Sequence, residues 1–116
     1  MKLRDIVTHI TIDSRKLTEY ALNLDNPKGK NKAIMFARHL GFTKNNYQLL
    51  LNRIESNALD AEAILQKTDI YGQRYQVDIE IKGVEKDRKE TVRTGWIVKP
   101  NSNVARLITL YVRKRK

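Results

Sequence analysis

The feature of this sequence that most constrains the fold is a change of hydrophobic period at Tyr71. After that residue, apolar side chains alternate with polar or charged ones, and the apolar set is Tyr75, Val77, Ile79 and Ile81. Successive side chains of a strand point to opposite faces, so this alternation is typical of a strand that is buried on one face only.

The strand pattern continues to the end of the chain, with two interruptions. The charged residues over 83–89 predict a hairpin loop, and a second strand is expected over 91–99. A turn follows at 100–103, where the sequence reads Pro-Asn-Ser-Asn, and the third strand is expected over 104–112. The second half of the chain is therefore predicted to be an antiparallel meander.

Helical spacing dominates the first half of the chain. An apolar stripe with that spacing begins after Gly29 and ends before Gly41; its members are Ala33, Phe36, Ala37 and Leu40. A glycine after the last periodic residue is a common left-handed cap, so we expect the helix to end at Gly41. Thr43 then predicts the start of another helix, which runs to about residue 56.

The other segments give weaker signals. Alternation over 8–13 predicts a short strand, and Asp13 or Ser14 caps a helix that ends at Leu22. Residues 57–70 are expected to be irregular, with a short helix near 60–66. Because helices precede strands, we expect one α+β domain over 1–116, with N-terminal helices packed on one face of the C-terminal antiparallel meander. The opposite face is left for solvent or a ligand.

The chain is strongly basic. Lys and Arg number 23 and Asp and Glu 13, which gives a formal net charge of +10. Such a surplus favours a polyanionic partner, most often nucleic acid; an acidic protein partner and a merely solvated surface are the alternatives. The sequence has no cysteine, so disulfides and thiolate metal sites are excluded.

The expectations about cellular location and cofactors rest on features that the sequence lacks. We find neither a signal-peptide pattern near Met1 nor an 18-residue apolar run, so we expect a cytoplasmic protein without a membrane span. Asp78 and Glu80 share a strand face, but neither a histidine nor a third carboxylate stands at ligand spacing. We therefore expect no metal and no cofactor.

The first candidate site lies at the predicted helix entry. Lys28, Lys30 and Lys32 cluster where backbone N–H groups and the helix dipole already favour an anion, and Lys32 is the sharpest candidate for a phosphate ligand. The alternative is a solvated helix entry. His39 follows Lys32 by seven residues on roughly the same helix side, which makes it a candidate for proton transfer.

The second group of candidates lies on the predicted strands. Arg93 and Arg106 are cations inside strands, and the planar guanidinium suits phosphate. Thr109 and Tyr111 carry hydroxyls and are expected on the same face as Leu107; strand propensity alone is the alternative for the threonine.

The remaining nucleic-acid candidates are aromatic residues and one further arginine. Trp96 would either pack in the core or stack on a base. Tyr71 and Arg74 belong to the polar string Tyr-Gly-Gln-Arg-Tyr at 71–75, at the start of the first predicted strand, and are candidates for contacts with nucleic acid.

Several strings resemble one small bacterial domain family of unknown function that is common in cyanobacteria. In the first half these are Gly-Lys-Asn-Lys-Ala at 29–33, Phe36, Leu-Gly-Phe-Thr at 40–43 and Asn46. In the second half they are Tyr-Gly-Gln-Arg-Tyr at 71–75, Val-Arg at 92–93, Trp-Ile-Val at 96–98 and Ala-Arg-Leu at 105–107.

The resemblance covers about 28–111. Members of the family in turn resemble the compact ribonuclease toxins of the barnase and colicin type, in which helices pack on an antiparallel sheet. Similar domains are found beside small antitoxin-like genes or at the ends of large secreted toxins. The resemblance therefore implies RNA as a partner and a small acidic antitoxin protein as a second one.

Three hypotheses follow from the sequence. The first is a metal-independent endoribonuclease, the toxin of a toxin–antitoxin pair, that cleaves RNA to a 2′,3′-cyclic phosphate. Its candidate catalytic residues are Lys32, Arg93, Thr109, Tyr111 and His39; its candidate nucleic-acid contacts are Lys28, Lys30, Arg74, Arg106, Tyr71 and Trp96. The second is a non-catalytic RNA- or DNA-binding module, and the third is a basic domain that docks an acidic protein. The sequence does not determine the oligomeric state.

Overall fold

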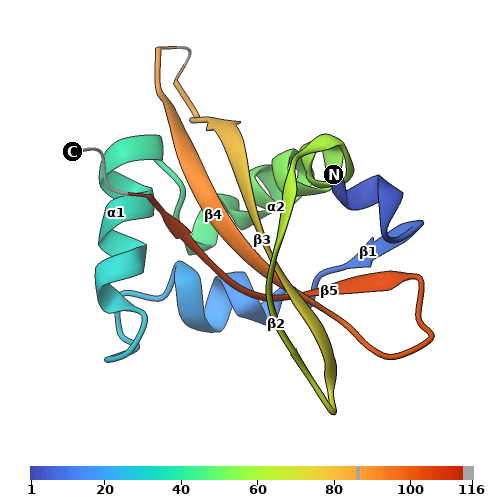
Figure 1. The fold of residues 1–116 in the computed structure, drawn as a ribbon. Helices are drawn as coiled ribbons and strands as arrows, with labels where there is room; N and C mark the ends of the chain where they lie inside the picture. The colour runs from blue at the N-terminus through green and yellow to red at the C-terminus, as the bar shows by residue number, and fades with distance from the viewer. Residues whose placement is uncertain (86, 114–116) are drawn as a thin grey trace.

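The computed structural model describes residues 1–85 and 87–113, and it has an α+β architecture (Figure 1). A five-stranded sheet has the order β1-β5-β4-β3-β2. The strands are β1 (His9–Thr11), β2 (Ala63–Asp69), β3 (Gly72–Lys82), β4 (Lys89–Val98) and β5 (Val104–Val112). Neighbouring strands are antiparallel except β1 and β5, which are parallel. The predicted fold class is confirmed.

The helices precede the meander, as expected, and lie on one side of the sheet (Figure 1). They are the α-helices α1 (Lys30–Leu40) and α2 (Tyr47–Asn57), the π-helix η2 (Lys16–Ala21), and the 3-10 turns η1 (Leu3–Asp5), η3 (Lys44–Asn46) and η4 (Ala58–Asp60). Gly41 ends α1 with a φ of 78°, which confirms the predicted left-handed cap. Thr43 accepts a hydrogen bond from the Asn45 N–H and so begins the next helical segment.

The prediction for residues 57–70 is wrong. Half of this segment forms β2, an edge strand that is antiparallel to β3, where a short helix was expected. Ala63 is buried, but Ile64 and Leu65 are both about half exposed, so the rest of the strand has no buried face and shows no alternation. Its pairing is made by backbone hydrogen bonds, which no side-chain pattern reports.

Trp96 belongs to the core and is not free to stack on a base. Its side chain is fully buried, and its Nε1 donates to Thr94 Oγ1 at 2.7 Å. The same hydroxyl donates to the Val77 carbonyl oxygen at 2.6 Å. Of the two alternatives for this tryptophan, core packing is correct, because an indole N–H can be buried when a partner satisfies it.

A β-bulge in β5 determines which side chains leave the core. Gly95 pairs with Thr109 and Trp96 pairs with Leu107, so Ile108 is an extra residue on β5. Leu107 is buried, yet Thr109 lies on the opposite side of the sheet with Tyr111. The expectation that these two hydroxyls share a face with Leu107 is therefore wrong, because the bulge shifts the alternation by one residue.

Candidate functional site

The candidate site lies along the edge of β5 that β1 leaves unpaired. β1 pairs with β5 only as far as Arg106, and beyond that point α1 and η2 contact β5. The site therefore forms at a seam between this edge of β5 and the helices η2 and α1, which are far from β5 in the sequence (Figure 1). The loop between η2 and α1 brings the first turn of α1 close to η2, because an ideal Cβ at Gly29 would lie 2.3 Å from the Tyr20 carbonyl oxygen.

Lys32 is at the centre of the seam. Its Nζ donates to Tyr20 Oη at 2.7 Å and to Thr109 Oγ1 at 3.3 Å. It also lies 4.6 Å from the centroid of the Tyr20 ring and 5.5 Å from that of the Tyr111 ring. The half-buried ammonium is thus held by hydroxyls and aromatic faces.

No carboxylate pairs with Lys32 in the part of the chain that the structure describes. Hydroxyls and ring faces orient the ammonium but leave its full charge in place. A partly desolvated cation without a counter-ion attracts an anion more strongly than an exposed lysine does, because water screens it less. The seam is consequently suited to one phosphate group.

A second cationic centre lies beside Tyr111 on the same sheet face. Arg93 is opposite Tyr111 across β4 and β5, and opposite Asp78 across β3 and β4. It binds the carboxylate of Asp78 with two hydrogen bonds, from Nε at 2.9 Å and from one terminal nitrogen at 3.1 Å. Arg113 approaches the same carboxylate at 3.4 Å.

This cluster has two guanidinium groups and one carboxylate, so it keeps a net positive charge. The bond to Asp78 is the main cause that raises the pKa of Arg93 above its usual value, and a bond with the Tyr111 hydroxyl raises it further. Arg93 stays charged at every accessible pH, and the bidentate geometry fixes its plane.

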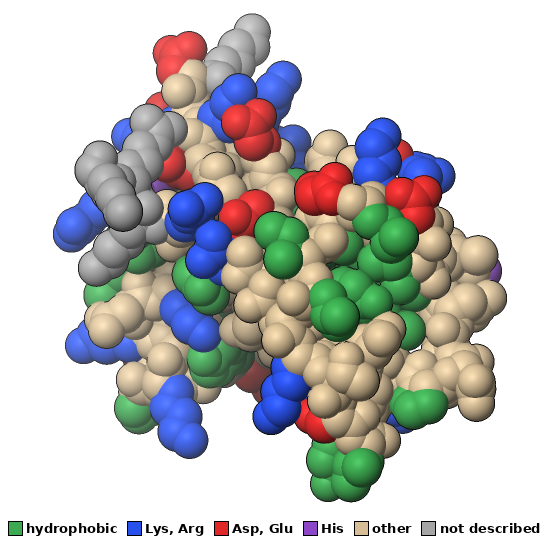
Figure 2. Space-filling model, viewed as in Figure 1, with side chains coloured by type: hydrophobic (Ala, Val, Ile, Leu, Met, Phe, Trp, Pro, Cys, Tyr) green, Lys and Arg blue, Asp and Glu red, His purple; other side chains and the backbone are tan. Residues whose placement is uncertain are grey.

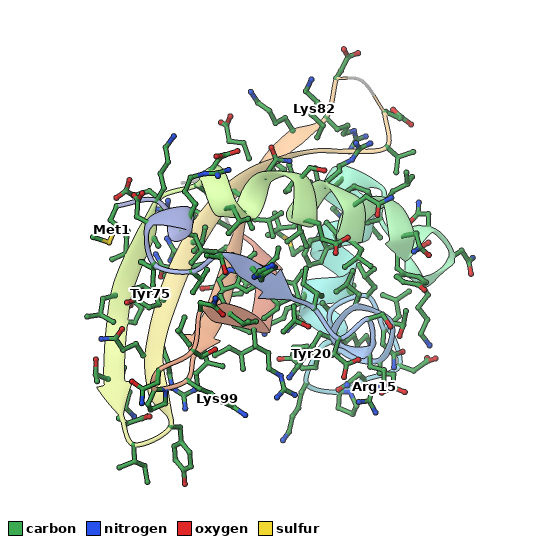
Figure 3. All side chains as sticks on the ribbon, turned by 90° about the vertical axis from the view of Figure 1, so that its right-hand side faces the viewer. Met1, Arg15, Tyr20, Tyr75, Lys82 and Lys99 are labelled. Carbon is green, nitrogen blue, oxygen red and sulfur yellow. The ribbon has the colours of Figure 1, made fainter. Side chains whose placement is uncertain are left out.

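Two hollows lie beside these groups: the hydrogen-bond partners of Lys32, Tyr20 and Thr109, line the first, and Lys32 itself lines the second. The first, which we call the η2 pocket, has a volume of about 560 Å³ and is lined by Arg15, Lys16 and Tyr20 near η2 and by Arg106 and Thr109 on β5. Figure 3 shows Arg15 and Tyr20 close together beside η2. The second, which we call the α1 pocket, has a volume of about 460 Å³; its lining is Asn31, Lys32, Met35, Tyr111, Val112 and Arg113.

Charge is distributed unevenly over the molecule. In Figure 2, Lys and Arg side chains are numerous on the side of α1 and the end of β5, whereas a hydrophobic patch covers the side of β2 and β3. In the η2 pocket, Arg15 pairs with Asp13 at 2.7 Å, and this bond lowers the pKa of Asp13 to about 2. Arg106 also lines that pocket and is exposed.

Several candidate residues from the sequence meet in this seam and others do not. Lys32, Thr109 and Tyr111 come together, with Arg93 next to Tyr111 and Arg106 in the η2 pocket. Lys28 and Lys30 are exposed at the entry of α1.

The other candidates are remote from Lys32. His39 is half-buried in the last turn of α1, and seven helical residues place it about 10 Å from Lys32 along the axis. Arg74 lies near the start of β3, where its Nε is 3.6 Å from a carboxylate oxygen of Asp69. Tyr71 is 65% exposed at the β2–β3 turn. His39 is therefore not placed to act on a phosphate that Lys32 holds.

Sequence reasoning missed Tyr20 and Asp78. Tyr20 has helical spacing with Leu17 and Ala21, which gives it the signature of a core residue although its hydroxyl reaches Lys32. In the sequence, Asp78 stands out only together with Glu80, as a possible metal ligand, yet the register of the two predicted strands places it opposite Arg93. Cross-strand pairing of opposite charges was the signal available for that residue.

The described residues contain no group of three or more histidine and acidic side chains that could hold a metal ion. Within the same residues, no helix is long and apolar enough to span a membrane.

Comparison with known proteins gave one family. No curated protein and no solved structure matches the chain. The model of one protein family matches residues 2–114, which is nearly the whole sequence and includes every residue of the seam. The chain therefore belongs to the family described as domain of unknown function DUF6883.

Proposed function

We propose that this protein is a metal-independent endoribonuclease that acts as the toxin of a toxin–antitoxin pair. The observation that carries the proposal is the environment of Lys32: a half-buried ammonium held by Tyr20, Thr109 and the Tyr111 ring, with no carboxylate partner among the described residues. It is consistent with the ribonuclease toxins to which the sequence motifs point.

The reaction is an internal transfer of the phosphoryl group. The ribose 2′-oxygen forms a bond to phosphorus while the bond from phosphorus to the 5′-oxygen breaks, which leaves a 2′,3′-cyclic phosphate and a 5′-hydroxyl. The 2′ proton passes to the departing 5′-oxygen through hydroxyl groups of the site, each of which accepts one proton as it gives up its own. Atoms and protons balance without water or a metal.

The chain's own residues match the needs of that step. Negative charge grows on the phosphate oxygens in the transition state, and a preorganised cation in a partly dry site stabilises it. Lys32 supplies that cation. Arg93 uses two of its five N–H donors on Asp78 and has others for phosphate or for Tyr111. Thr109 and Tyr111 supply the hydroxyls that orient and transfer protons.

The toxin role rests on charge. A ribonuclease that is active in the cell that makes it needs an inhibitor, and a formal charge of +10 favours an acidic protein. Such an inhibitor would cover the same cationic seam that binds RNA.

The test is incubation of the protein with a labelled single-stranded RNA in EDTA, with Lys32→Met beside it. Methionine keeps the length of the side chain and removes the charge. We expect fragments that end in a cyclic phosphate, and a rate at least about 100-fold lower for Lys32→Met, as for loss of other preorganised charge donors.

Lys44→Met is the matched control, because Lys44 is exposed at the start of η3. It should cut RNA at the normal rate, and both variants should unfold at temperatures close to that of the unaltered protein. Equal cleavage by Lys32→Met would refute the assignment. RNA that is bound but never cut would instead identify a binding module.

A further inference from the structure

The α1 pocket has a chemical character unlike that of the rest of the seam. Met35, Val112 and the Tyr111 side chain give it apolar walls, whereas Asn31 and Arg113 bring polar groups to it. Its volume of about 460 Å³ falls in the usual range for sites of small organic ligands, about 300–1,000 Å³. Apolar walls with a few polar groups suit a flat heterocycle better than a phosphate.

The position of the pocket relative to Lys32 narrows the identity of that heterocycle. Lys32 lines the α1 pocket, and its two hydrogen-bond partners, Tyr20 and Thr109, line the η2 pocket. A phosphate on Lys32 would therefore lie between two hollows. In a nucleic-acid strand, each phosphate has a nucleoside on either side, and this arrangement of hollow, cation and hollow matches that repeat.

The two hollows differ in charge in the way that two subsites would. The η2 pocket is lined by the cations Arg15, Lys16 and Arg106 and by the carboxylates of Asp13 and Glu19, so it is polar and keeps a small positive charge around the second nucleoside. The α1 pocket has one thioether, one aromatic ring and one aliphatic side chain for contact with a base. Sulfur and ring contacts of this kind favour a planar aromatic partner.

We infer that the α1 pocket is a nucleobase subsite, next to the phosphate position at Lys32, and that Asn31 makes it prefer adenine. This inference rests on the proposed function for the identity of the strand. The Asn31 side chain is exposed at the start of α1 and has no hydrogen-bond partner among the described residues. An asparagine amide offers a donor and an acceptor side by side, which pairs with the N6 and N7 groups of adenine.

The experiment measures binding without cleavage. Four dinucleotides that lack the 2′-hydroxyl, and so cannot form a cyclic phosphate, contain adenine at the first position, the second, both or neither. Each is titrated into protein with 13C-labelled methionine methyl groups. Met35 reports on the α1 pocket, and Met1 is an internal control, since it lies far from Tyr20 in Figure 3.

We expect the Met35 signal to move on titration while the Met1 signal stays in place. A dinucleotide with adenine at one of the two positions should bind at least about fivefold more tightly than the dinucleotide without adenine. This factor is the lower end of what one bidentate contact contributes. Asn31→Ala should abolish that preference. Asn52→Ala, the same change at an exposed position of α2, should keep it.

The inference is overturned if Met35 does not respond at saturation, or if Asn31→Ala leaves the adenine preference intact. When RNA is still cleaved in a Lys32-dependent way, either result removes the base subsite and leaves the proposed function standing. A Met35 response without any RNA cleavage would support the subsite and refute the nuclease.

Discussion

Thr94 in β4 allows a sharp test of the energetics of the fold. This fully buried hydroxyl donates to the Val77 carbonyl at 2.6 Å and accepts from Trp96 Nε1 at 2.7 Å. Thr94→Val keeps the branched shape and removes both bonds. The stranded indole N–H costs about 1–3 kcal/mol and the lost carbonyl bond about 0.5–1.5 kcal/mol, so we expect a total destabilisation of about 2–4 kcal/mol.

For a domain of this size, each kcal/mol lowers Tm by roughly 4 °C, so Thr94→Val should melt about 8–16 °C lower. Thr94→Ser is the matched control: it keeps the hydroxyl and loses one methyl group, which costs about 1 kcal/mol. The expected order of stability is therefore threonine, then serine, then valine. A scale based on side-chain hydrophobicity alone gives the opposite order for the two variants.

The assay is urea unfolding, followed both by far-ultraviolet circular dichroism and by the fluorescence of Trp96, the single tryptophan of the chain. The slope with urea should stay constant across the three proteins, so that midpoints report stability. A valine variant as stable as the serine variant would refute the argument that the indole N–H depends on Thr94.

Two further predictions concern an ion pair and a turn. Arg15→Gln removes the bond that lowers the pKa of Asp13, so this pKa should rise from about 2 towards its usual 3.8 in a carboxyl-carbon NMR titration, and an unchanged value would contradict the assigned cause. The lowered pKa means that the pair stabilises the fold fully above pH 4 and less as pH falls towards 2, so Arg15→Gln should lose less stability over that interval. Gly72→Ala should cost at least about 3 kcal/mol in urea unfolding, since φ is +132° and a Cβ would lie 2.1 Å from the Val98 carbonyl oxygen. Gly41→Ala, with φ +78° but ordinary contacts at 3.4 Å, should cost only about 1–2 kcal/mol.

If the proposed function is correct, the cations of this chain differ in importance. Lys28 and Lys30 are exposed and screened by water, whereas Lys32 is half-buried between aromatic rings. Screening reduces the attraction of exposed charges beyond about 10 Å, so in the proposed ribonuclease they would contribute to encounter with RNA more than to fixed geometry. We therefore expect specificity to depend on Lys32 and its neighbours and not on the total charge.

The parts of the fold that the sequence predicted are those with strong local signals. Alternation identified β3, β4 and β5, and the stripe from Ala33 to Leu40 between two glycines identified α1. Local periodicity reports which side of an element is buried, and that is enough to establish the α+β class. It failed for β2, because an edge strand whose two faces are exposed over most of its length imposes no pattern on its side chains.

The composition of the candidate site was partly visible in the sequence, but its assembly was not. Lys32, Arg93, Thr109 and Tyr111 stood out as residue types suited to phosphate chemistry. Their meeting depends on contacts across 77 positions, on the free edge of β5 beyond Arg106, and on the bulge at Ile108 that turns both hydroxyls out of the core. Residue type and local period are properties of short stretches, so the sequence by itself determined most of the elements and the basic character of the chain. Strand register and packing are decided only in the tertiary structure, because they join residues that are far apart in the sequence. They brought Tyr20 and Thr109 to the ammonium group of Lys32.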